Sequence, residues 1–233
     1  MKSAILNEDS VIEIGKSVPI SAYRKFFEER AEKDLSGWDF QSWLNMQAGK
    51  TLKEAMEDLE GTGEPKGMKD LLSENRFHII SEPDKAFILD FDDKIKELGY
   101  DFGGGIGDGY YWGKFMIVYA KTGVKTKKVI ARIYIREDSI ILRLFLNNVD
   151  KHTEYIENAP EHIKEAFVGP NGNCSCNPKK ENCRMRKTYV MDDRLIEKCG
   201  GVIFEFWNPT VEKCQDYIDL LKEFYPVKKS KRM

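Results

Sequence analysis

The chain has few of the residues that perform most catalytic chemistry. Histidine occurs 3 times and cysteine 5 times in 233 residues. None of His78, His152 and His162 forms a recognisable motif with a serine or cysteine nucleophile, and no H-E-x-x-H or P-loop pattern occurs. The sequence therefore identifies no reaction.

Long apolar runs and an excess of one charge are also missing. The richest apolar stretch, Ile140–Leu146, contains Arg143 and is too short to span a bilayer. The first twenty residues lack a basic segment followed by an apolar one, so we predict no signal peptide. A net charge of -2 provides no overall attraction to nucleic acid or to an anionic membrane. We expect a cytoplasmic protein without a membrane or nucleic-acid partner.

Four of the five cysteines are placed where a metal ion could bring them together. Cys174, Cys176 and Cys183 share one polar loop, and Cys199 lies in a later glycine turn. In the cytosol such clusters favour metal or redox roles over disulfides, and four thiolates would close a structural zinc site. A disulfide or redox pair and free surface thiols remain alternatives. Cys214 lies on the apolar stripe of a helix, so we interpret it as a buried small hydrophobe.

The first eighty residues are predicted to be a helical segment that contains a glycine- and proline-rich linker at Gly61–Pro65, and a second unit is predicted to begin near Ser81. The apolar residues of the first segment recur at helical spacing. The elements that we predict are helices over Ala22–Leu35, Thr51–Leu59 and Lys66–Leu72, and a short strand over Phe77–Ile80.

Residues 81–233 are predicted to form an α+β domain with a cysteine-rich loop. Strands that follow one another through short turns pair antiparallel, and helices precede and follow them. We therefore expect an antiparallel sheet of about five strands with flanking helices. The predicted elements are a helix over Asp84–Leu98, strands over Lys114–Lys121, Val129–Glu137 and Ile140–Leu146, helices within Val149–Phe167, a hairpin of Lys187–Met191 with Arg194–Lys198, a strand over Val202–Trp207 and a last helix that starts at Asn208-Pro209.

A glycine-rich loop, Asp101–Gly109, precedes the sheet. Nucleotide-binding glycine loops follow a strand and open a helix, whereas this one follows a helix and leads through Tyr110, Tyr111 and Trp112 into a strand. The reversed context argues against phosphate binding. The loop is either a mobile connection or a lid whose aromatic residues form a pocket wall.

Alternation along the strands predicts one aliphatic sheet face and one face that mixes arginines with aromatic residues. The mixed face is either an ordinary solvated surface or a ligand surface, because arginine suits carboxylates and phosphates and aromatic rings offer flat apolar contact. The candidate ligand-binding residues are Arg132, Tyr134, Arg136, Arg143, Phe145 and Trp207 on the strands, with Tyr111 and Trp112 beside the glycine loop.

Two charged groups have simpler interpretations. Asp90, Asp92 and Asp93 are predicted to form the solvated face of a helix, and the alternative, a catalytic carboxylate dyad, has no other support in the sequence. The basic segments Arg184–Lys187 and Lys228–Arg232 could touch phosphates if they converged, but acidic residues flank the first of them. A nucleic-acid-binding module is therefore the third function that we consider.

From about Ser81 to Pro226 the chain resembles a family of small, uncharacterised bacterial cytosolic proteins. The resemblance implies cysteines in the same loop, often as C-x2-C where this chain has C-x-C, and it implies no activity. The segments that carry it are Glu97–Gly104, Trp112–Lys114, Lys121–Lys125, Ala131–Arg136, Asp150–His152, Ile156–Pro160, Arg186–Tyr189 and Phe204–Phe206.

These observations predict a zinc-stabilised ligand-binding or sensing module for a small anionic or aromatic molecule. The alternative is an enzyme that uses a pocket between the glycine loop and the arginine face, for which a carboxylate or histidine with a strongly shifted pKa would be the sign. The sequence does not specify the ligand or the oligomeric state.

Overall fold

A computed structural model describes residues 6–15, 18–36, 39–61, 66–121, 128–173, 183, 185–200 and 202–226. The chain divides into two compact units. The first comprises Met1–Ser81, Phe102–Ile117 and Tyr134–Asp138, and the second Glu82–Asp101, Val118–Ile133 and Ser139–Met233. The helical N-terminal segment is thus supplemented in its unit by the glycine loop and two strand ends.

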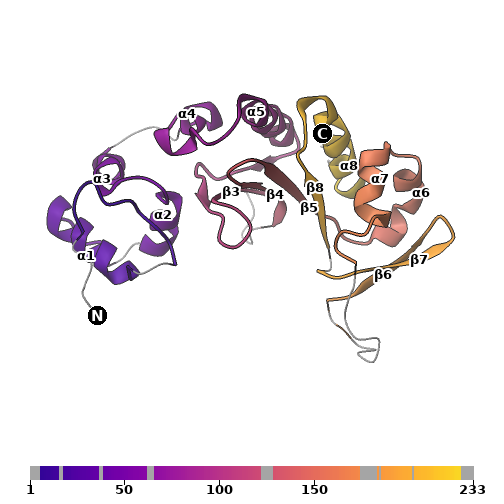
Figure 1. The fold of residues 1–233 in the computed structure, drawn as a ribbon, viewed down its shortest axis with the longest axis horizontal. Helices are drawn as coiled ribbons and strands as arrows, with labels where there is room; N and C mark the ends of the chain where they lie inside the picture. The colour runs from indigo at the N-terminus through magenta and orange to yellow at the C-terminus, as the bar shows by residue number, and fades with distance from the viewer. Residues whose placement is uncertain are drawn as a thin grey trace, which may run out of the picture. The chain divides into compact units, whose positions relative to one another are not determined.

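The first unit is mainly helical (Figure 1). Its elements are helices α1 Ile20–Ala31, α2 Phe40–Met46, α3 Leu52–Glu60 and α4 Met68–Leu72, the 3-10 turn η1 Asn75–Phe77 and strand β2 Gly107–Asp108. Thr51 and Glu54 begin α3 with a capping box in which each side chain accepts the other's backbone N–H. The predicted strand over Phe77–Ile80 is wrong. Phe77 instead closes η1, where its N–H donates to the carbonyl of Glu74 at 2.9 Å.

An aromatic core holds the helices of the first unit together. Phe27 of α1 meets Trp43 of α2 edge-on at 5.1 Å between ring centroids. The extended segment that ends at Ile12 completes this core, because Ile12 N–H donates to the Lys50 carbonyl at 2.8 Å and its side chain is fully buried. The buried members of the cluster are Ile12, Tyr23, Phe26, Phe27, Leu35, Phe40, Leu44, Leu52, Ala55 and Leu59.

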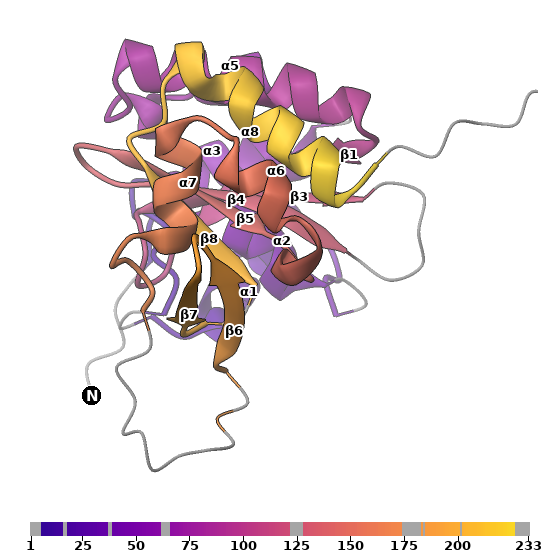
Figure 2. The same ribbon diagram turned by 90° about the vertical axis from the view of Figure 1, so that its right-hand side faces the viewer.

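The second unit contains most of an antiparallel sheet with helices packed against it. The sheet has strand order β1-β3-β4-β5-β8, and β2 also pairs with β3. Helices α5 and α8 lie side by side (Figures 1 and 2). The elements are α5 Glu82–Glu97, β1 Tyr100–Asp101, β3 Phe115–Lys121, β4 Val129–Ile135, β5 Ile140–Phe145, η2 Val149–Lys151, α6 Thr153–Glu157, α7 Glu161–Val168, β6 Lys187–Met191, β7 Arg194–Lys198, β8 Ile203–Trp207 and α8 Val211–Phe224. The α+β architecture and the antiparallel sheet of about five strands are as the sequence predicts.

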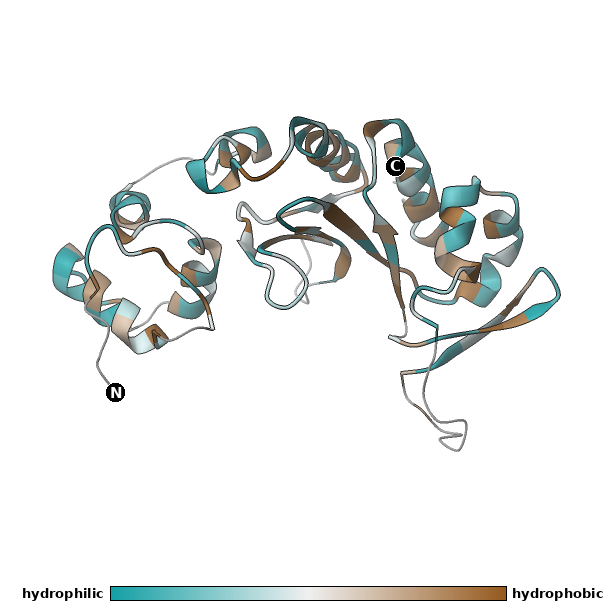
Figure 3. Cartoon of the chain, in the orientation of Figure 1, coloured by the Kyte–Doolittle hydropathy of each residue, from teal (hydrophilic) through white to brown (hydrophobic). Residues whose placement is uncertain are grey.

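The central strands are the most apolar part of the chain, whereas the helices present polar sides (Figure 3). Phe91 of α5 meets Tyr119 of β3 at 5.4 Å, and Phe87 of α5 meets Tyr217 of α8 at 6.1 Å between ring centroids. Cys214 of α8 is fully buried, as predicted. Among the described residues, no helix has the length and apolarity required to cross a bilayer.

The solvated alternative for the mixed sheet face does not hold at β5, and the prediction of a solvated Asp92 is wrong. Strand β5 is buried on both faces except at Phe145, so its second face is not an open surface. Asp92 is only 1% exposed, although the sequence places it on the wet face of α5. Its carboxylate contacts Lys96 at 2.6 Å. Burial raises the pKa of Asp92, with Lys96 acting in the opposite direction.

Candidate ligand pocket and candidate metal centre

The eight predicted ligand residues fall into both units. Tyr111, Trp112, Tyr134 and Arg136 belong to the first, and Arg132, Arg143, Phe145 and Trp207 to the second. In the first, Trp112 and Tyr134 are in ring contact at 6.4 Å.

In the second unit the arginines are engaged with neighbouring side chains. Arg143 of β5 is 5% exposed and forms an ion pair with Glu205, its register partner on β8. Arg132 of β4 stacks over the Phe145 ring at 5.2 Å. Trp207, opposite Ile141 in the register, stays 46% exposed. The guanidinium of Arg143 is thus paired with Glu205 within the sheet, and this ion pair offsets the cost of removing its charge from water.

One hollow in the first unit has a volume of about 470 Å³, and we call it the tyrosine pocket. Its floor includes buried Ile12, Ala48 and Phe115, and its rim carries exposed Tyr110 and Tyr111. Its full lining is Val11, Ile12, Glu13, Ile14, Gly15, Ala48, Gly49, Asp108, Tyr110, Tyr111, Gly113, Lys114 and Phe115. Of the eight predicted ligand residues, Tyr111 lines this pocket.

The tyrosines stand at the tip of a tight hairpin between β2 and β3. Asp108 pairs with Phe115, and inside that pair the Gly109 N–H donates to the Lys114 carbonyl at 3.3 Å. Tyr110 has a left-handed backbone with φ of 51°, held by its N–H donating to Asp108 Oδ1 at 2.6 Å. These bonds fix the aromatic wall without requiring a hinge in the glycine loop.

Two glycines let backbone and ring approach closely around this pocket. A Cβ on Gly113 would lie 2.6 Å from the Ile135 carbonyl oxygen. A Cβ on Gly49 would lie 2.8 Å from the Phe115 ring, and the φ of +81° at Gly49 also disfavours a side chain. The pocket therefore depends on glycine outside the loop that the sequence singles out.

A second hollow in the first unit, of about 220 Å³, contains a network of paired charges. Lys50 Nζ contacts Asp58 at 2.5 Å and Glu74 at 3.0 Å, and Lys66 Nζ contacts the same carboxylates at 3.3 and 3.0 Å. Burial alone would raise the pKa of Asp58 and of Glu74, but the surrounding cations outweigh it and lower both. Because positive and negative groups alternate and are paired, this network is suited to joining elements of the fold.

Arg76 extends the charge network into the backbone. Its Nε donates to Glu74 at 2.8 Å, and its Nη1 donates to the carbonyls of Met46 and Ala48 at 2.9 and 2.7 Å. Burial lowers the pKa of Arg76, while Glu74 acts against that shift. The guanidinium thus satisfies carbonyls at the end of α2, next to the floor of the tyrosine pocket.

A third hollow, of about 460 Å³, lies in the second unit around His152. Glu223 Oε1 contacts His152 Nδ1 at 2.8 Å, and the imidazole stacks on Phe224 at 4.1 Å. Tyr155 and Asn158 also line this hollow. A carboxylate that orients an imidazole in this way leaves the second ring nitrogen available for proton transfer. No sequence pattern indicates this pair, because 71 positions separate its members.

Two of the four cysteines of the candidate metal centre belong to the described residues. Cys174 and Cys176 lie outside the described residues, whereas Cys183 and Cys199 lie within them. In the described part of the chain, no group of three or more potential ligands from His, Cys, Asp and Glu comes together.

The described stems of the cysteine loop meet beside Cys199. On one side Asn173 bridges to Lys198, and the Cys199 N–H donates to the Gly172 carbonyl at 2.7 Å. On the other side Lys187 pairs with Lys198 in the β6–β7 hairpin, and the Arg186 N–H donates to the Cys183 carbonyl at 3.0 Å. Both ends of the predicted ligand loop are thereby anchored at Lys198 and Cys199.

Lys198 secures the first stem with a buried ammonium group. Its Nζ donates to the carbonyls of Gly169 and Asn171 at 2.5 and 2.6 Å. Burial lowers the pKa of Lys198, as expected for an amine bonded to neutral carbonyls. The base of the loop is therefore held by the chain's own hydrogen bonds.

No family model, curated protein or solved structure matches this chain. The features that bear on function are therefore the pockets and the described ends of the cysteine loop.

Proposed function

We propose that this protein is a zinc-stabilised module that binds a small ligand with an aromatic or apolar body in the tyrosine pocket. The observation that carries the proposal is the pocket's construction. Exposed Tyr110 and Tyr111 are held by a closed hairpin tip above a buried apolar floor. Small-molecule sites combine such apolar walls with a few polar groups, and volumes of roughly 300–1,000 Å³ are usual.

Loss of one rim ring tests this proposal directly. A set of small aromatic fragments is screened against the full chain by ligand-observed NMR, and each hit is measured again with Tyr111→Ala. We expect affinity to fall by about tenfold, the effect of losing one ring contact. The matched control is Trp207→Ala, which removes an exposed ring from the predicted sheet-face site. Hits that lose affinity with Trp207→Ala and keep it with Tyr111→Ala would move the site to that face.

The zinc part of the proposal rests on the two loop stems. Asn173 bridges to Lys198, and Lys187 pairs with the same residue, so the described ends of the loop lie beside Cys199. This supports the proposal that the loop cysteines and Cys199 hold one zinc ion. A metal held by four thiolates has no open position for substrate, so its role would be structural.

One observation favours an enzyme as the second candidate. The His152–Glu223 pair lies in a hollow that Tyr155 also lines, which is an arrangement suited to general acid–base chemistry. On this alternative, replacing Glu223 with glutamine would lower turnover of any substrate found while leaving the tyrosine pocket's affinities unchanged.

Nucleic-acid binding is the least favoured function. Arg184 and Lys228–Arg232 lie outside the described residues, so their convergence stays a prediction. Arg186, from the same basic segment, is already within 3.4 Å of Glu197.

A further inference from the structure

We propose that the ligand of the tyrosine pocket is an amphoteric molecule of the amino-acid type, which carries an ammonium group, a carboxylate and an apolar or aromatic side chain. This inference rests on the proposed function and specifies the ligand class for the same site.

The pocket lining contains side chains of both charge signs. Asp108 and Lys114 both line it, and among the described residues neither has an ion-pair partner. Asp108 accepts one hydrogen bond, from the Tyr110 N–H, through Oδ1. Glu13 adds a second carboxylate to the lining. A ligand with a single charge would satisfy one sign alone, whereas a zwitterion matches both.

The backbone of Val11 offers groups that an amino acid can also use. Val11 is the bridge partner of Thr51, and the flanking bonds are Ile12 N–H to Lys50 and Leu52 N–H to Ser10. In this antiparallel arrangement the N–H and C=O of Val11 itself point away from Thr51. Neither has a hydrogen-bond partner among the described residues, and Val11 lines the pocket.

The apolar part of the site suits the remaining side chain of such a ligand. Ile12 and Phe115 provide a buried floor, and the rings of Tyr110 and Tyr111 provide a flat rim. A volume of about 470 Å³ accommodates one amino acid with a large side chain.

Four probes that share the phenylalanine side chain and differ in charge test the inference on the full chain. Phenylalanine is the zwitterion, phenylalanine amide the cation, N-acetylphenylalanine the anion and N-acetylphenylalanine amide the neutral form. Dissociation constants are measured by calorimetry or by protein-observed NMR. We expect phenylalanine to bind about tenfold more tightly than either singly charged probe, the effect of one hydrogen bond between charged groups.

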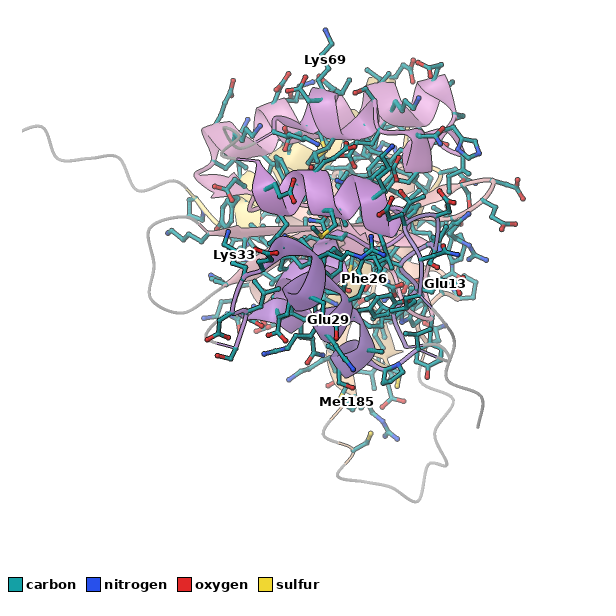
Figure 4. The ribbon with its side chains drawn as sticks, turned by 90° about the vertical axis from the view of Figure 1, so that its left-hand side faces the viewer. Glu13, Phe26, Glu29, Lys33, Lys69 and Met185 are labelled. Atoms are coloured by element: carbon teal, nitrogen blue, oxygen red, sulfur yellow. The ribbon has the colours of Figure 1, made fainter. Side chains whose placement is uncertain are left out.

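Two variants test which side chain contacts the ammonium group of the ligand and which contacts its carboxylate. Asp108→Asn keeps an acceptor for the Tyr110 N–H, and it should weaken phenylalanine and its amide about tenfold while sparing the N-acetyl acid. Lys114→Gln should weaken phenylalanine and the N-acetyl acid while sparing the amide. The matched control is Lys69→Gln, an exposed lysine of α4 that projects from the ribbon and lies outside the pocket lining (Figure 4).

The outcomes separate the two proposals. Equal affinity for the four probes, or variants that shift all probes alike, would overturn the amino-acid inference while leaving a ligand pocket in place. If none of the probes binds, and the fragment screen also gives no hit sensitive to Tyr111→Ala, the pocket function and the inference fail together.

Discussion

At the scale of single residues, several buried polar side chains decide local structure, and the sequence does not distinguish them from surface residues. Arg76, Asp92 and Arg143 are each at most 9% exposed. Each occurs in a segment whose pattern alone suggests a solvated position. A charged residue is expected to be exposed unless a partner that pairs with it is known. Cys214 was predictable because an apolar stripe surrounds it.

Arg76 gives the first prediction. Replacement by alanine leaves the buried carbonyls of Met46 and Ala48 without their donor and removes one cation from Glu74. We expect the free energy of unfolding to fall by about 3–5 kcal/mol, as for other broken buried ion pairs. Urea unfolding followed by circular dichroism measures it. Arg30→Ala, which removes a half-exposed pair with Glu8, should change stability by no more than about 0.5 kcal/mol. Equal effects of the two changes would show that Arg76 is not structurally important.

Replacing Asp92, unlike replacing Arg76, is expected to stabilise the protein. Because burial raises its pKa in the folded state, the ionised carboxylate lowers stability at neutral pH, and protonation removes that penalty as the pH falls through the raised pKa. Asp92→Asn should therefore raise the free energy of unfolding at pH 7 by about 1 kcal/mol, which a higher melting temperature would show. This gain in stability should shrink as the pH is lowered. Asp93→Asn on the exposed side of α5 is the control. A loss of stability at pH 7 with Asp92→Asn would mean that the contact with Lys96 outweighs the burial.

At the scale of elements, long periodic segments were predictable and short ones were not. The helix predicted over Asp84–Leu98 is α5, and the three central strands lie within two residues of their predicted bounds. The hairpin turn at Asp192 and Asp193 is also confirmed, since both have the left-handed backbone of a two-residue hairpin turn. Helix α2 was missed because seven residues are too few to show a period, and α8 begins after Thr210 and not at Pro209.

The β2–β3 hairpin gives a prediction about the pocket. Gly113→Ala would place a methyl group against the Ile135 carbonyl, so the tip must shift. We expect stability to fall by roughly 2 kcal/mol and binding at the tyrosine pocket to weaken with it. Gly67→Ala is the matched control, because its Cβ would find ordinary contact at 3.6 Å and its φ of -70° suits alanine. Unchanged binding with Gly113→Ala would place the ligand elsewhere.

The charge network between α3 and η1 predicts acid sensitivity of the first unit. Asp58 and Glu74 have folded-state pKa values below their ordinary values of 3.8 and 4.5. Stability from these carboxylates is complete above the unfolded-state pKa values and is lost as the pH falls through the folded ones. Unfolding monitored from pH 6 to pH 2 should show this loss below about pH 4.5, and Asp58→Asn with Glu74→Gln should flatten the curve. If stability fell equally steeply with pH in the wild type and in the double variant, the network would be excluded as the cause of the acid sensitivity.

At the scale of the whole molecule, the fold class followed from the sequence, but the composition of the units did not. The α+β class came from runs of strands with helices on either side. The first unit includes 102–117 and 134–138, which sequence analysis assigned to the second domain. Spatial neighbours from distant segments leave no local pattern, so the tyrosine pocket could not be derived from the residues that line it.

The zinc proposal makes a whole-molecule prediction. Purified, reduced protein should contain about one zinc per chain. Cys183→Ser should abolish metal content, and Cys214→Ser should leave it unchanged because that thiol is buried in the core. Chelation should accelerate amide exchange in the β6–β7 hairpin, which is anchored beside Cys199, while β3–β5 stay protected. Folded, reduced protein without metal would contradict the proposal.

The most direct test of the ligand-binding claim is to map a bound aromatic fragment on the full chain by protein-observed NMR. The account predicts that amide shifts concentrate in the lining of the tyrosine pocket, which is residues 11–15, 48–49, 108, 110–111 and 113–115, and that Tyr111→Ala suppresses them. Shifts concentrated around His152 and Tyr155, or along the β5–β8 pair, would contradict it and place the binding site in the second unit.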